Sequence, residues 1–213
     1  MSLILKTNKH SIQNFTIFAE RHCGTNFLEK WINKSLNIPV TWKYGWKHFW
    51  AHHEKTIPYS NNTLFIGIVR NPYNWIAAMY KNPYHIILKP KITLLNFMNC
   101  KIISIDNKTG DLLEQEYNNI FHLREIKNNH LLNTMPNICK NYLLLNYESL
   151  FHIDIIFDAI VSNFKLSQYS FFSNNFIQSH YTLGELEVDT INKNINWTTE
   201  NLLNYEVSDV TKK

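Results

Sequence analysis

Hydrophobic positions along this chain form short continuous runs, each followed by a stretch with helical spacing. The runs are rich in β-branched and aromatic residues, which predicts four strands, at residues 14–19, 40–44, 64–69 and 142–147. The first, third and fourth runs are almost continuously apolar, as is typical of strands that are covered on both faces. We therefore expect these three strands to be central in a sheet.

Apolar residues recur at helical intervals elsewhere, which predicts helices over residues 25–36, 72–81, 148–163 and 198–205. Pro72 suits the first turn of the second helix, and Thr198 is a candidate cap for the last. Alternating strands and helices favour an α/β fold, with a central parallel sheet flanked by helices. Residues 82–111 are the least regular segment and are expected to form a flap or substrate loop.

Composition narrows the class of protein. The 213 residues are 45% hydrophobic, which is enough for one sizeable core, so we expect a single domain over residues 1–213. The residues Met1–Leu3 resemble an expression remnant and are left out of the fold prediction. The net charge of +4 comes from scattered Lys and Arg residues, which favours a small anionic ligand over nucleic acid.

Targeting and cysteine patterns point to a soluble protein. No uncharged apolar run approaches the roughly 18 residues of a membrane span, and no leader pattern is present, so a cytoplasmic location is expected. The three cysteines, Cys23, Cys100 and Cys139, share no metal-ligand spacing and indicate neither a disulfide framework nor a zinc knuckle.

The first candidate site is the sequence ERHCGTNF, residues 20–27, which joins the first predicted strand to its helix. Such a turn aims backbone N–H groups at one point, and Gly24 permits close approach of a ligand. Thr25 and Asn26 add side-chain donors, so the turn suits a phosphate. The alternative is that Gly24 only turns the chain and Thr25 only caps the helix. The turn is not a Walker A motif, because the phosphate-binding Lys and the magnesium-binding Ser or Thr are missing.

The third predicted strand, like the first, is followed by a short turn and then a helix. In the sequence IVRNPYNW, Arg70 follows the strand and precedes a helix that starts with Pro72. Because ligands of α/β sheets bind at the carboxyl ends of the strands, Arg70 would supply a second cation near the first turn. Two such sites fit a ligand with two separated phosphate groups; the alternative is that Arg70 makes a surface salt bridge.

Three blocks in order resemble the family of sulfotransferases that use 3′-phosphoadenosine 5′-phosphosulfate (PAPS). AERHCGTNFLEKWI resembles the 5′-phosphosulfate loop of that family, IGIVRNPYNWIAAMY its 3′-phosphate segment, and YLLLNYESL a later strand that ends in Tyr-Glu-x-Leu. The resemblance covers roughly residues 14–150 and implies a P-loop-like three-layer sandwich, with PAPS as co-substrate and no metal.

The resemblance also implies roles for individual residues. The 5′-phosphosulfate would bind Arg21, His22, Cys23, Gly24, Thr25 and Asn26; Phe27 would lie against the adenine, Arg70 would bind the 3′-phosphate, and Tyr147 would lie near the adenine edge. The chain departs from the family at Ala78, where a Ser commonly binds the 3′-phosphate, and in the loop, which lacks its usual Lys. The C-terminal 3′-phosphate loop is not recognisable, and Lys193 is the nearest substitute.

Sulfuryl transfer needs a base for the acceptor hydroxyl and positive charge near the leaving oxygen. His is suited to the first task, and Arg or Lys to the second. The sequence YGWKHFWAHHEK places Lys47 and His48 after the second predicted strand, so we expect both to emerge at the same sheet edge as Arg21. The candidate catalytic residues are His48 as the base, with Lys47 and Arg21.

Two alternatives remain for this segment. His48 and His52 are four residues apart and His53-Glu54 follows, so a zinc site is conceivable, although no third ligand is evident. The histidines could also merely flank packed aromatic residues such as Trp46 and Phe49.

The resulting function is sulfuryl transfer from PAPS to a hydroxyl acceptor, with glycans among the candidate acceptors. Two other functions stay open: a P-loop kinase of a small hydroxyl substrate, which the missing Walker A residues disfavour, and a relative that binds nucleotide or glycan without turnover. The sequence does not name the acceptor or the oligomeric state.

Overall fold

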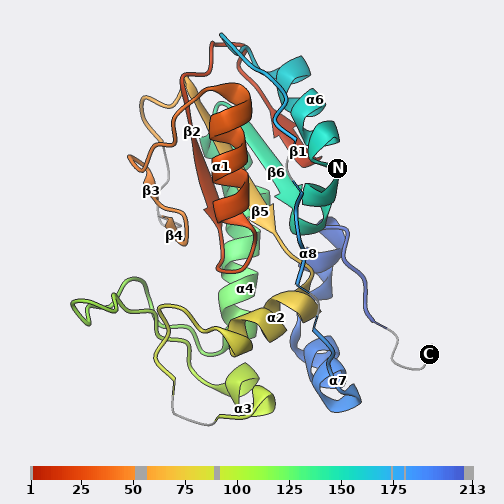
Figure 1. Ribbon diagram of the computed structural model, residues 1–213. Coiled ribbons are helices and arrows are strands. Elements are labelled where there is room, and N and C mark those ends of the chain that lie inside the picture. Colours follow the sequence, from red (N-terminus) through yellow and green to blue (C-terminus); the bar gives the residue numbers. More distant parts are fainter. Residues whose placement is uncertain (1, 51–56, 89–91, 174, 180, 209–213) are drawn as a thin grey trace. The chain divides into compact units, whose positions relative to one another are not determined.

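The computed structural model describes residues 2–50, 57–88, 92–173, 175–179 and 181–208 (Figure 1). It shows a mixed α/β fold in which the chain forms two compact units. The first unit comprises Met1–Arg70 and Asn129–Gln178, and the second comprises Asn71–Asn128 and Ser179–Lys213. The expected flap, residues 82–111, belongs wholly to the second unit.

The first unit is built on a four-stranded sheet in the order β1-β6-β5-β2. Three of the strands were predicted, namely β2 (Asn14–Ala19), β5 (Thr63–Val69) and β6 (Tyr142–Asn146), and they run parallel to one another. The predicted parallel sheet is thus found in part: the complete sheet is mixed, because β1 (Ser2–Lys6) pairs antiparallel with β6. Setting the first residues aside as an expression remnant removed an edge strand from the prediction.

The strand predicted at residues 40–44 is also wrong. Only Val40 bridges Phe15 of β2, with backbone bonds from Phe15 N to Pro39 O (3.0 Å) and from Thr41 N to Phe15 O (2.7 Å). The chain then turns, since Gly45 N donates to Trp42 O and Gly45 has a φ of 106°. A two-residue hairpin follows, formed by β3 (Gly45–Trp46) and β4 (Phe49–Trp50).

Helix α1 (Thr25–Leu36) has the predicted bounds and buries Leu28, Trp31 and Ile32. The predicted helix at 148–163 instead begins as a 3₁₀ helix (Tyr147–His152) and continues as α6 (Ile153–Asn163). The α1 and α6 helices pack together through Trp31 and Phe157, whose ring centroids lie 6.2 Å apart.

A helical stretch not predicted from the sequence precedes β6. It consists of a π-helical turn (His130–Thr134) and α5 (Met135–Ile138). Tyr142 of β6 donates its hydroxyl hydrogen to Leu131 O (2.8 Å), and Gly67 leaves room for both residues: a Cβ there would lie 2.5 Å from the Tyr142 hydroxyl. Gly67 therefore permits close packing of this stretch on β5.

The second unit contains α2 (Pro72–Lys81), α3 (Leu94–Asn99), most of α4 (Ile120–Asn129), α7 (Glu185–Asn194) and α8 (Trp197–Leu202). The predicted bounds of α2 are confirmed. Asn196 caps α8 by accepting hydrogen bonds from Thr198 N and Thr199 N, so the predicted cap Thr198 is wrong. Residues 198–205 are helical only as far as Leu202. In the described part of the chain, no helix has the length and apolar character needed to cross a membrane.

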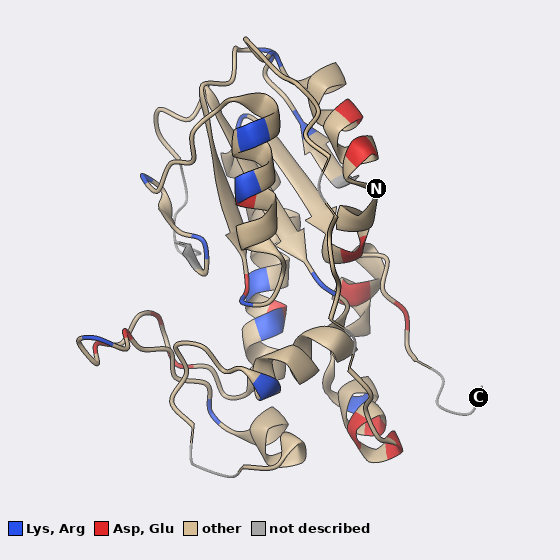
Figure 2. Ribbon diagram, viewed as in Figure 1, with Lys and Arg blue, Asp and Glu red and all other residues tan. Residues whose placement is uncertain are grey.

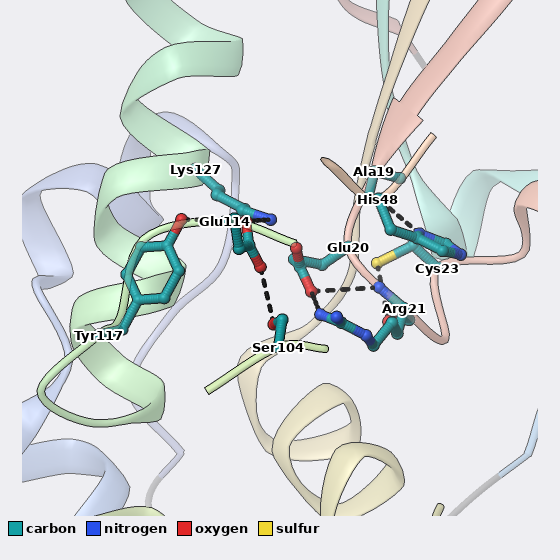
Figure 3. Close-up of polar contacts among 9 residues, drawn as sticks. All are labelled: Ala19, Glu20, Arg21, Cys23, His48, Ser104, Glu114, Tyr117 and Lys127. Carbon is teal, nitrogen blue, oxygen red and sulfur yellow. Dashed lines mark hydrogen bonds and ion pairs between the residues drawn. The ribbon is translucent and has the colours of Figure 1, made fainter. Parts of the chain in front are cut away.

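The segment before α4 is held by a buried cluster around Glu114. The carboxylate of Glu114 accepts hydrogen bonds from Ser104 Oγ (2.9 Å) and Tyr117 Oη (3.1 Å) and pairs with Lys127 Nζ of α4 at 2.7 Å (Figure 3). Isolated β-bridges, such as the antiparallel bridge between Ile102 and Tyr117, also pair the backbone of this segment. The described part of residues 82–111 therefore contains α3 and several paired backbone positions.

Candidate functional site

The candidate site lies where the parallel strands β2, β5 and β6 end. In each case the residue of interest follows directly: Glu20 and Arg21 after β2, Arg70 after β5, and Tyr147 after β6. Since β5 pairs in parallel with both β2 and β6, these carboxyl ends lie at one edge of the sheet (Figure 1). The three sequence blocks that carry the resemblance thus meet at that edge.

The turn between β2 and α1 depends on a left-handed backbone. His22 has a φ of 65° and Gly24 a φ of 77°. A Cβ on Gly24 would lie 2.8 Å from Leu150 Cδ1 and 3.2 Å from the Tyr147 ring. Glycine is required at this position for two reasons, the positive φ and the close packing of the Tyr147–His152 helix.

Helix α1 begins directly after Gly24 with its first amides directed away from the helix body. Gly24, the N-cap residue of α1, has no side chain to cap the helix, and the first turn of α1 contains no acidic residue. The N–H groups of such a helix start carry partial positive charge and are suited to bind an anion. Thr25 is buried here, whereas Asn26 is exposed and lies within reach of Lys47.

Arg21 is almost completely buried, and its guanidinium pairs with Glu20: Nη1 lies 3.0 Å from Oε2 (Figure 3). The Cys23 thiol lies 3.7 Å from the Arg21 carbonyl oxygen and is also buried. Glu20 therefore offsets the positive charge of Arg21, which the resemblance implied as a ligand of the 5′-phosphosulfate. Sequence reasoning missed Glu20, although it stands directly before Arg21.

Arg70 is 1% exposed and braces the β2–α1 turn. Its Nη1 donates a hydrogen bond to the His22 carbonyl oxygen at 2.8 Å, and its guanidinium carbon lies 4.2 Å from the centroid of the Tyr147 ring. A cation held against an aromatic face in this way is stabilised by the ring quadrupole. Arg70 thus connects all three strand ends.

Lys47 and His48 come close to the end of β2 through the β3–β4 hairpin. Ala19 N donates to Lys47 O (2.9 Å), while His48 Nδ1 lies 2.8 Å from Ala19 O (Figure 3). The Lys47 ammonium donates to Asn26 Oδ1 and lies 3.5 Å from Glu29 Oε2, both on α1. The hairpin, not a strand at residues 40–44, therefore positions the predicted pair.

The environment of His48 sets its protonation state. Burial lowers the pKa of His48 from 6.5 to about 4, and the hydrogen bond to Ala19 O offsets this only in part. With Nδ1–H donating to a carbonyl oxygen, the neutral ring carries its lone pair on Nε2. His48 is thus neutral near pH 7 and can accept a proton at Nε2.

A cluster of aromatic rings around Phe176 packs near the β2–α1 turn. The Phe27 ring lies 4.8 Å from that of Phe176, and Tyr147 lies 5.0 Å from Phe176 in an edge-to-face arrangement. Phe151 also contacts Phe176 at 5.5 Å. The sequence analysis named Phe27 and Tyr147 but missed Phe176, since residues 165–178 show no periodic pattern that singles it out.

The remaining candidates lie elsewhere in the chain. Lys193 is exposed on α7 of the second unit and pairs with Asp189 at 2.7 Å, and Ala78 is fully buried in α2. His52 and His53 lie outside the described residues. Among the residues that are described, no group of three or more His, Cys, Asp or Glu side chains is arranged to hold a metal ion.

Comparisons with known proteins assign no family to the chain. A scan against models of known protein families finds no match. A search of curated proteins finds no significant match either. The functional argument therefore rests on the residues at the strand ends.

Proposed function

We propose that this protein is a sulfotransferase that transfers the sulfuryl group of PAPS to a hydroxyl acceptor. The observation that carries the proposal is the convergence at one sheet edge of the β2–α1 turn, Arg70 and Tyr147. These are the residues of three sequence blocks that resemble the family in the same order. A P-loop-like three-layer arrangement and a cytoplasmic location are part of this proposal.

Each part of the donor PAPS would bind a different group of residues around the β2–α1 turn. Residues 22–26, which include the start of α1, would offer backbone N–H groups to the 5′-phosphosulfate, and Arg70 would offer its guanidinium to the 3′-phosphate. The Arg21 N–H donates to Glu20 Oε2 at 3.4 Å. Phe27 and Tyr147 supply the flat apolar surface that an adenine ring needs, and Phe176 extends that surface.

His48 is suited to be the base in the transfer step. The acceptor oxygen attacks sulfur and forms a new S–O bond, while the bond from sulfur to the bridging phosphate oxygen breaks and its electron pair leaves with the phosphate. Nε2 of His48 takes the proton of the acceptor hydroxyl. Lys47, with the amides of α1, would offset the charge that develops on the leaving oxygen.

Two other functions were considered, a P-loop kinase and a binding protein without turnover. A P-loop kinase needs a Lys and a magnesium-binding hydroxyl in the turn, and His22, Cys23 and Thr25 do not provide that set at the required spacing. A binding protein without turnover is consistent with Ala78 and with the pairing of Arg21 with Glu20.

The test is turnover with a radiolabelled sulfate donor against a panel of hydroxyl acceptors. We expect His48→Ala to reduce turnover by about a hundred- to ten-thousand-fold, the range typical of a general base. Binding of the donor product should stay within a few fold, and His52→Ala and His53→Ala should have much smaller effects. Full turnover in His48→Ala would contradict the role of His48, and activity lost on chelation and restored by zinc would support a metal site instead.

A further inference from the structure

Residues 42–48, which we call the aromatic turn, contain Lys47 and His48 together with three aromatic residues. Trp42 and Trp46 are 41% and 37% exposed, whereas Trp side chains are highly buried on average. Each lies beside one of the two catalytic candidates. Lys47 Nζ is 5.9 Å from the centroid of the Trp42 ring, and the Trp46 and His48 rings are 5.1 Å apart, edge to face.

Tyr44 anchors the aromatic turn to the sheet. Tyr44 donates its hydroxyl hydrogen to Tyr59 O (2.9 Å), and its ring packs 5.0 Å from that of Phe65 in β5. The exposed Trp rings therefore project from a turn whose centre is tied to the sheet. Such preorganised aromatic surfaces bind ligands at a low cost in side-chain entropy.

The positive charge of the aromatic turn comes mainly from Lys43, because Glu29 of α1 lies 3.5 Å from the Lys47 ammonium and offsets its charge. Residues 37–48 contain two Lys and no Asp or Glu, and the turn that leads into β3 shows Lys but no acidic residue in Figure 2. Lys43 is exposed, and its ammonium lies 5.6 Å from the Tyr44 ring and 5.5 Å from the Tyr59 ring. It forms no ion pair with the part of the chain that the structure describes.

We propose that the aromatic turn is the acceptor site, and that the acceptor is an acidic oligosaccharide whose sugar rings stack on Trp42 and Trp46 while an anionic group pairs with Lys43. This inference rests on the proposed function. A sugar seated on Trp46 lies beside His48, so its hydroxyls are near the group that removes the proton. A single-stranded nucleic acid could also stack on these rings, but Lys and Arg do not cluster here as such a backbone requires.

The test is calorimetric titration of the intact chain, without donor, with three probes of similar length. The probes are a hexasaccharide of alternating uronic acid and amino sugar, a neutral chitin hexasaccharide and an oligouridylate. We expect binding of the acidic hexasaccharide alone. Binding of the neutral sugar with equal affinity would overturn the role of Lys43, and preferential binding of oligouridylate would overturn the sugar assignment.

Variants locate the binding site. Trp42→Ala and Trp46→Ala should each weaken binding of the acidic hexasaccharide by about tenfold or more, as truncated aromatic anchors do. The matched control is Tyr84→Ala, an aromatic residue that is 59% exposed in the second unit. Lys43→Ala should weaken binding and reduce its salt dependence, whereas Lys9→Ala should do neither. Trp46→Tyr, which keeps a flat ring, should restore part of the affinity and guards against a folding defect.

Donor binding separates failure of this inference from failure of the proposed function. If the chain binds 3′-phosphoadenosine 5′-phosphate but not the acidic hexasaccharide, the acceptor assignment is wrong and the proposed function stands. If it binds the hexasaccharide through Trp42 and Trp46 but not the nucleotide, the proposed function fails and the acceptor role fails with it. The Trp variants should leave nucleotide binding unchanged.

Discussion

His48 combines a fixed ring orientation with a lowered pKa, and the two have different causes. Its Nδ1 is held by the Ala19 carbonyl oxygen at 2.8 Å, which orients the ring, and its burial lowers its pKa to about 4. A base must be neutral to accept a proton, and His48 meets this condition across the whole neutral range. The low pKa also makes it a weak base, so positioning must supply much of its effect.

The lowered pKa of His48 predicts acid sensitivity of the fold. The folded pKa of about 4 lies below the unfolded value of 6.5, so the unfolded chain binds more protons between these values. Stability from this group is therefore full above pH 6.5 and is lost as the pH falls toward 4. We expect urea unfolding to show a loss of about 2 kcal/mol between pH 7 and pH 4.5 from His48 alone.

The measurement compares the unmodified chain with His48→Gln, and His10→Gln serves as the control because His10 is exposed. His48→Gln should flatten the dependence of the unfolding free energy on pH, and His10→Gln should leave it nearly unchanged. Equal slopes for the unmodified chain and His48→Gln would show that His48 is not buried as a neutral ring.

At the scale of elements, the β2–α1 turn and the Tyr147–His152 helix form one packed unit. The contact is made by Gly24, which has a positive φ and lies against Leu150 and Tyr147. The same helix carries the ring on which Arg70 rests. A change at Gly24 should therefore affect both the fold and the anion site.

Gly24→Ala should destabilise the first unit by about 2 to 4 kcal/mol, which combines a backbone cost of roughly 1 kcal/mol with overpacking of roughly 1 to 3 kcal/mol. Gly110→Ala is the matched control, because Gly110 also has a φ of 77° but a Cβ there meets no atom within 4 Å. It should show the backbone cost alone. Denaturant unfolding measures both, and equal losses would contradict the packing of Leu150 on Gly24.

The elements show how far the sequence could predict this fold. The strands at 14–19, 64–69 and 142–147 and the helices at 25–36 and 72–81 were predictable because each buries a continuous or periodic apolar set. The 40–44 segment has the composition of a strand, but its Trp42 and Lys43 side chains are exposed and Gly45 turns the chain, so only Val40 pairs. A turn that contains β-branched and aromatic residues therefore has the composition of a strand, even where those residues are exposed.

The candidate site was predictable only in part for a similar reason. Arg70 and the β2–α1 turn follow strands that the pattern identifies, and parallel pairing brings them together. The pairing of Arg21 with Glu20, the packing of Leu150 on Gly24 and the position of Phe176 depend on tertiary contacts, which local pattern does not encode.

At the scale of the whole molecule, the second unit is stabilised by a buried polar cluster of its own. The second unit contains a buried ion pair between Arg124 of α4 and Glu200 of α8, with Nε to Oε1 at 2.6 Å and Nη2 to Oε2 at 2.7 Å. Asn128 Nδ2 donates to the same carboxylate at 3.2 Å, and the Arg124 guanidinium lies 5.2 Å from the Trp75 ring centroid. This cluster joins α2, α4 and α8.

Glu200→Gln should destabilise the second unit by about 3 to 5 kcal/mol, because it leaves the buried Arg124 charge without its counter-charge. The control is Glu116→Gln, which breaks the exposed pair with Lys101 and should cost at most about 1 kcal/mol. Hydrogen exchange should rise in α2, α7 and α8 and remain low in β2 and β5. A uniform rise through both units would show that they unfold as one.

The central claim is that the turn and Arg70 bind the two phosphate ends of a PAPS-type nucleotide without metal. The most direct measurement is the melting temperature with 3′-phosphoadenosine 5′-phosphate, without divalent ions, compared with ATP plus magnesium. We expect a concentration-dependent rise with the first ligand alone, and Arg70→Ala should weaken its binding by about 1.5 to 3 kcal/mol. A rise with ATP and magnesium, and none with 3′-phosphoadenosine 5′-phosphate, would contradict the account.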